Sequence, residues 1–134
     1  MRDRLKKVQR IVSVHKQLRQ LTEWKIASLR REEMRLEQDQ EKLIDSLNSD
    51  ALHHGLFVAA MAKRLSALST ERANVRDSER AMQEKLVEDS VRLKAVERVA
   101  RHVEQSYDAH QESKQLTAIV EQSVSADSAS FRKA

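Results

Sequence analysis

The chain has 134 residues with one glycine, no proline and no cysteine, and it is 34% charged but only 3% aromatic. Turns usually use glycine or proline and compact cores usually use aromatic side chains, so this composition favours long helices over α/β, all-β and loop-rich folds. Without cysteine there are no disulfides, thiolate metal sites or cysteine nucleophiles. The net charge of +4 is uneven, because residues 1–35 hold eleven basic and four acidic side chains.

The sequence shows no targeting or membrane-spanning pattern. Eight of the first 25 residues are Lys or Arg, which does not fit the apolar core of a secretion signal. No window approaches 18 consecutive apolar residues. We therefore expect a cytoplasmic protein.

A first helix is predicted over about residues 3–47. Two apolar stretches lie along it, separated by a change of phase that would locally unwind a supercoil. The first stretch has the 3–4 spacing of a coiled coil, and the second has a spacing of seven. The two stretches are Ile11, Val14, Leu18 and Leu21, then Leu29, Leu36 and Leu43.

A break is predicted within residues 48–55. Asn48 can end the first helix, and Ser49 or Asp50 can cap the second, because their side chains compete for backbone hydrogen bonds. Gly55 is the only glycine in the chain. We expect the chain to reverse direction here.

A second helix is predicted over about residues 52–123, followed by a Ser- and Ala-rich tail, about 124–134, that we expect to fray. From Val58 to Tyr107, positions taken alternately three and four residues apart are mostly apolar, which is typical of a coiled-coil seam. The apolar seam residues proposed to face the first helix are Val58, Met61, Leu65, Leu68, Val75, Met82, Leu86, Leu93, Val96 and Val103.

The predicted fold is all-α: residues 1–134 form a single helical hairpin, a long antiparallel two-helix coiled coil. The polar residues Arg72, Glu79 and Asp89 interrupt its seam. Folding about residue 51 would place Arg72 opposite residues 31–33 and Trp24 near Glu79. Trp24 either packs on the partner helix or serves as an exposed docking residue.

The sequence contains no GxGxxG, GxxxxGK(S/T), HExxH or GxSxG motif. The histidines lack the spacing of a metal site, and we interpret them as solvated or seam-edge residues: His15, His53, His54, His102 and His110. We expect no catalytic residues, no metal and no cofactor, and a protein that is not an enzyme.

Basic residues gather where an antiparallel hairpin brings the start of the first helix beside the second helix. This arrangement can bind an acidic partner or phosphates, although interleaved aromatic residues for stacking on nucleic-acid bases are absent. The candidate partner-binding residues are Arg2, Arg4, Lys6, Lys7, Arg10, Arg92, Lys94, Arg98 and Arg101.

Several segments resemble the FliJ/YscO family, the small stalk proteins of flagellar and type III secretion export, and in particular its α-proteobacterial flagellar members. They are the basic start at residues 4–10, the Leu-x-x-Leu-x-x-Trp-Lys segment at residues 18–25, Leu-Arg-Arg-Glu-Glu at 29–33, and Leu-Phe-Val at 56–58 leading into Met-Ala-Lys-Arg-Leu at 61–65.

The resemblance implies a non-enzymatic stalk or adaptor. Members of this family form an antiparallel two-helix coiled coil, engage the export ATPase ring, contact the export gate membrane protein and escort export chaperones. A cytoplasmic protein associated peripherally with the inner face of the membrane is then expected. Two alternatives remain: a structural coiled coil that self-associates, and a nucleic-acid-binding adaptor.

Overall fold

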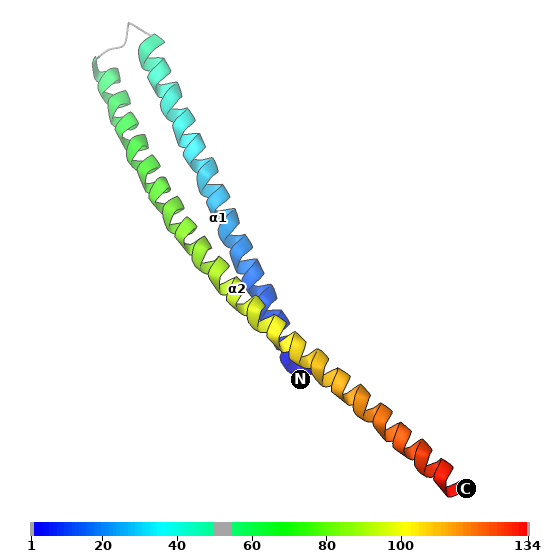
Figure 1. Ribbon diagram of the computed structural model, residues 1–134. Coiled ribbons are helices and arrows are strands. Elements are labelled where there is room, and N and C mark those ends of the chain that lie inside the picture. The colour runs from blue at the N-terminus through cyan, green and yellow to red at the C-terminus, as the bar shows by residue number, and fades with distance from the viewer. Residues whose placement is uncertain (1, 50–54, 134) are drawn as a thin grey trace. The chain divides into compact units, whose positions relative to one another are not determined.

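The computed structural model describes residues 2–49 and 55–133, which form two α-helices, α1 (Arg2–Ser49) and α2 (Gly55–Lys133). The two helices pack antiparallel (Figure 1). Hydrogen bonds and ion pairs between their side chains join them. The prediction of an all-α helical hairpin is confirmed. The expected break lies largely outside the described residues, as do His53 and His54.

The extents of the helices follow from the composition. No proline occurs anywhere, and no glycine follows Gly55, so nothing in the sequence forces α2 to end or kink. The helix accordingly continues through the Ser- and Ala-rich stretch, where fraying was expected, as far as Lys133.

The chain divides into two compact units, each built from both helices. Unit 1 combines residues 1–16 with residues 92–134, and unit 2 consists of residues 17–91. Each unit has a small buried core at the contact between its parts of α1 and α2. In unit 1 these buried residues are Val8, Leu93 and Val103, and in unit 2 they are Ile26, Leu36 and Leu68.

The least exposed positions of α2 follow the 3–4 spacing described above. Of the ten seam residues proposed from the sequence, nine are buried or half-buried. Val58 differs, with 42% of its surface exposed. Arg72, Glu79 and Asp89 also lie at less exposed positions on the side of α2 that faces α1. The stripe ends near Tyr107, and all described side chains from residue 112 onward are exposed.

The prediction that the apolar stretch at the start of α1 forms part of the coiled-coil seam is wrong. Its residues, Ile11 and Val14 in unit 1 and Leu18 and Leu21 in unit 2, are 44–52% exposed. The side chains of α1 that are buried or half-buried instead keep one 3–4 spacing, so the expected change of phase is absent. They include Leu5, Val8, Val12, His15, Thr22, Ile26, Leu29, Glu33, Leu36, Gln40, Leu43 and Leu47.

The expected pairing of residues between the helices is also shifted. Arg72 contacts Gln40 and Glu37 instead of residues 31–33, and Glu79 is paired with Arg30 instead of lying near Trp24. A shift of the turn along the sequence moves every cross-helix pair by the same amount, so a small error in placing the break has this effect throughout unit 2.

Candidate interaction surface

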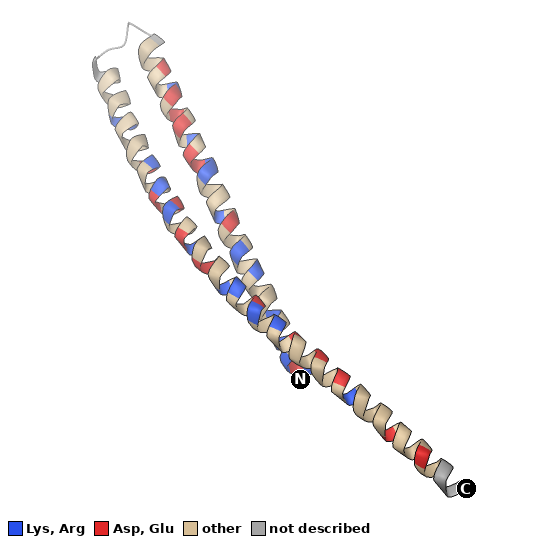
Figure 2. Cartoon of the chain, in the orientation of Figure 1, with Lys and Arg blue, Asp and Glu red and all other residues tan. Residues whose placement is uncertain are grey.

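The basic residues proposed from the sequence all belong to unit 1. Five lie on α1 and four on α2, and all nine are exposed: Arg2, Arg4, Lys6, Lys7, Arg10, Arg92, Lys94, Arg98 and Arg101. Within residues 2–16 and 92–103 only Asp3 and Glu97 are acidic. Figure 2 shows the Lys and Arg positions along both helices.

The nine basic side chains differ from the arginines of unit 2 in their pairing. Among the residues that the structure describes, none of the nine lies within ion-pair distance of a carboxylate. In unit 2, five arginines have carboxylate partners: Arg19, Arg30, Arg35, Arg72 and Arg76. Unit 1 therefore presents positive charge that its own described side chains do not neutralise.

Two ion pairs with short contacts join the helices in unit 2. Arg76 Nε donates to Glu33 Oε1 at 2.7 Å, and Arg30 Nε donates to Glu79 Oε1 at 2.9 Å. The hydrogen bond from Arg76 holds the pKa of the Glu33 carboxyl below its ordinary value, and it raises the pKa of Arg76. These contacts fix which residues of α1 and α2 lie opposite each other.

A polar layer surrounds Arg72. Its Nη1 donates to Gln40 Oε1 at 3.2 Å, and its Nη2 lies 3.6 Å from Glu37 Oε2. The Nε of this arginine is buried and has no hydrogen-bond partner among the described residues. Burial of a charged group with incomplete hydrogen bonding costs stability, so this layer contributes little to the free energy of unfolding. Its main effect is to favour the helix alignment that places Arg72 beside Gln40 and Glu37.

Thr22 and Asp89 form a second polar contact inside unit 2, and both are buried, with 2% and 7% of their surfaces exposed. The Thr22 hydroxyl oxygen lies 2.7 Å from Asp89 Oδ2 and 3.1 Å from the Leu18 carbonyl oxygen. A hydroxyl has only one proton to donate. The Asp89 carboxylate is the stronger of the two acceptors, because it is charged and lies closer. Sequence reasoning singled out Asp89 but not Thr22, whose signal is its place in the 3–4 spacing of α1.

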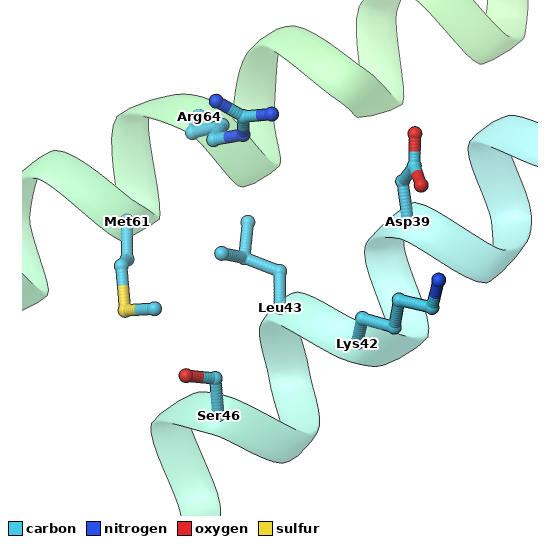
Figure 3. Close-up of a pocket in the computed structure, with 6 residues that line it drawn as sticks. All are labelled: Asp39, Lys42, Leu43, Ser46, Met61 and Arg64. Carbon is cyan, nitrogen blue, oxygen red and sulfur yellow. The ribbon is translucent and has the colours of Figure 1, made fainter.

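Shallow, open hollows lie along the contact between α1 and α2 of unit 2. One of about 370 Å³ is lined by both helices. Figure 3 shows Leu43 and Met61 projecting from opposite helices into the space between them, with Asp39 and Arg64 farther along. The lining is a mixture of apolar and oppositely charged side chains and contains no histidine.

Trp24 is the single tryptophan of the chain, and 62% of its surface is exposed. Of the two readings of this residue, packing against the partner helix does not fit this exposure. An aromatic ring in this position can contribute a large apolar area to a contact with another protein.

The described residues contain no group of three or more His, Cys, Asp and Glu side chains arranged to hold a metal ion. Within the same part of the chain, neither helix has a stretch long and apolar enough to cross a membrane.

The fold and these contacts define the chain as a coiled-coil-like helical hairpin, in which one unit carries nine exposed basic side chains with no ion pair among the described residues. Comparison with models of protein families, with curated proteins and with solved structures gives no match.

Proposed function

We propose that this protein is a stalk or adaptor of a flagellar or related type III protein export apparatus, and that unit 1 binds an acidic surface of the export ATPase ring. The observation that supports this most directly is the group of nine exposed basic side chains that have no carboxylate partner within the described part of the chain. The segments that resemble the FliJ/YscO family support the choice of partner.

Such an adaptor has a mechanical role and an electrostatic role. Cross-helix ion pairs and the Thr22–Asp89 contact hold α1 and α2 of unit 2 in one alignment. In unit 1, exposed guanidinium and ammonium groups attract acidic side chains and form charge-assisted hydrogen bonds with them. The resemblance adds contact with the export gate and escort of export chaperones.

The test measures how strongly the protein stimulates ATP hydrolysis by the purified export ATPase from the same organism. We expect replacement of Arg2, Arg4, Lys6 and Lys7 by Gln to reduce stimulation at least ~10-fold, because four charge-assisted contacts are lost while helix propensity is kept. Circular dichroism confirms that the variant is folded.

A matched control replaces four exposed basic residues of unit 2 by Gln: Lys25, Arg31, Lys42 and Lys85. This variant loses the same formal charge and should keep full stimulation. Equal effects of the two variants, or unchanged stimulation by the unit 1 variant, would refute binding through unit 1.

Binding of RNA or DNA at ~150 mM salt without any effect on the ATPase would favour the nucleic-acid alternative instead.

A further inference from the structure

The part of α2 that follows the seam has an apolar stripe of its own. Leu116, Ile119, Val120 and Val124, which we call the docking stripe, are 58–62% exposed. Their spacing of three to four residues places them on one side of the helix. Every described side chain from residue 112 to residue 129 is exposed, so α1 does not cover this stripe.

This part of α2 is poorly suited to stand as an isolated helix. Residues 115–128 contain four β-branched residues and three serines, which are weak helix formers. Helices in folded proteins draw most of their stability from packing an apolar face against other parts of the structure. The helical conformation of this segment is therefore best explained by a partner that covers the docking stripe.

The segment cannot cover itself by turning back onto its own α1. Between residue 56 and residue 134 there is no glycine or proline, and α2 is one continuous helix to Lys133. The described helices of one copy therefore leave the docking stripe open to a second molecule.

The charge of the segment indicates what that surface is. Residues 108–129 contain Asp108, Glu112, Glu121 and Asp127 but only one basic residue, Lys114. Two such segments placed against each other would bring like charges together. A basic surface with exposed aliphatic side chains would be complementary.

The chain itself carries such a surface on α1 of unit 1. Lys7, Arg10, Ile11 and Val14, which we call the acceptor face, have the spacing of one helix face, and all four are exposed. Ile11 and Val14 are three residues apart, as are Leu116 and Ile119. Lys7 and Glu112 each lie four residues before the first aliphatic residue of their respective faces.

We propose that the docking stripe of one copy binds the acceptor face of a second copy, with the two helices parallel at this contact. Leu116 then lies on Ile11, Ile119 lies on Val14, and Glu112 lies beside Lys7. The same contact formed in both directions gives a closed dimer with two equivalent interfaces. The proposal does not rest on the export function, but both use Lys7, so the dimer and an acidic partner would compete for this residue.

The first experiment measures the dimer dissociation constant by analytical ultracentrifugation. We expect Leu116→Gln to weaken the dimer at least ~10-fold, because a buried leucine would be lost from each interface. Val87→Gln is the matched control, since Val87 is an equally exposed aliphatic residue of α2 outside both faces. A wild-type chain that stays monomeric at about 100 μM would overturn the proposal, because even a dimer with a dissociation constant of about 100 μM would be substantially populated there.

Charge reversal tests the alignment of the two faces. Lys7→Glu and Glu112→Lys should each weaken the dimer, and the double variant should recover most of the loss because the pair is restored with opposite sign. Additive losses in the double variant would mean that these residues do not meet.

Cross-linking separates this arrangement from other dimers, and the natural chain has no cysteine to interfere. An Ile11→Cys chain mixed with a Leu116→Cys chain should form a disulfide-linked dimer under mild oxidation, whereas Met34→Cys mixed with Leu116→Cys should not. Efficient self-cross-linking of Val120→Cys, with no product from the first mixture, would show that two docking stripes pair with each other and would refute the proposal.

Discussion

Thr22 and Asp89 show at the scale of single residues how a polar contact can be required inside an apolar seam. A buried carboxylate without a hydrogen-bond donor is unfavourable, and the Thr22 hydroxyl at 2.7 Å is the donor that the described structure provides. The pair favours the alignment that places residues 22 and 89 opposite each other, because a shift toward Ile26 or Leu29 would leave Asp89 against an aliphatic side chain.

Thr22→Val should lower the free energy of unfolding by about 1–3 kcal/mol, because Asp89 would remain buried without its partner. Combining Thr22→Val with Asp89→Leu should recover most of this loss, since both polar groups are then absent. Thermal melts followed by circular dichroism measure both values. Equal stability of Thr22→Val and the wild-type chain would contradict the role of the contact.

Glu33 makes the stability of unit 2 depend on pH. Its pKa is held below the ordinary value of 4.5 by the hydrogen bond from Arg76, so the ionised form is favoured in the folded state. The stabilisation is present above pH 4.5 and is lost as the pH falls through the lowered pKa.

Melting temperatures measured between pH 7 and pH 3 should therefore fall less steeply in Glu33→Gln than in the wild-type chain. Glu84→Gln serves as the control, because Glu84 is exposed and has no ion pair among the described residues. Parallel curves for the wild-type chain and Glu33→Gln would show that this pair does not contribute.

At the scale of the helices, the two seams differ in how clearly the sequence reveals them. The seam of α2 could be predicted because aliphatic residues occupy most of its positions over 50 residues. The seam of α1 could not, since several of its positions are polar: His15, Thr22, Glu33 and Gln40. The regular aliphatic stretch from Ile11 to Leu21 was the stronger pattern, yet it is exposed.

The predicted hairpin and its basic residues depended on composition and position alone, and the structure places all nine of those residues in one unit. The cross-helix pairs depended on the exact length of the turn, which helix patterns do not contain. The Thr22–Asp89 contact therefore could not be predicted from the sequence, and neither could the partners of Arg72 and Glu79.

Leu93→Asp should destabilise the hairpin by about 3 kcal/mol or more, because it places an unpaired charge in a buried position of unit 1. Val91→Asp is a close control, since Val91 is two residues away on the same helix and is exposed. Chemical denaturation followed by circular dichroism compares them. Similar losses in both variants would show that the two sides of α2 are not distinguished by burial.

At the scale of the whole molecule, packing is unevenly distributed along the chain. Cross-helix hydrogen bonds and ion pairs are found within unit 2, and the seam of unit 1 ends near Tyr107. Local stability follows the density of such contacts. Residues 112–129 should thus be the least protected part of α2 in a dilute sample.

Hydrogen exchange followed by mass spectrometry tests this expectation. Peptides from residues 112–129 should exchange at least ~100-fold faster than peptides from residues 82–103 at low concentration, where any dimer has dissociated. Protection of residues 112–129 should then rise with protein concentration. Slow exchange of these residues in a dilute monomer would mean that the segment is stable without a covering surface.

The separation of charge between the units has a consequence for the speed of recognition. Unit 1 has thirteen Lys and Arg residues against seven Asp and Glu, whereas unit 2 has twelve against fourteen. An anionic body approaching from solution is attracted to unit 1 and weakly repelled by unit 2, over about 10 Å at 0.1 M ionic strength. The field therefore favours collisions that orient unit 1 toward an acidic partner. The association rate constant should fall steeply as the salt concentration rises.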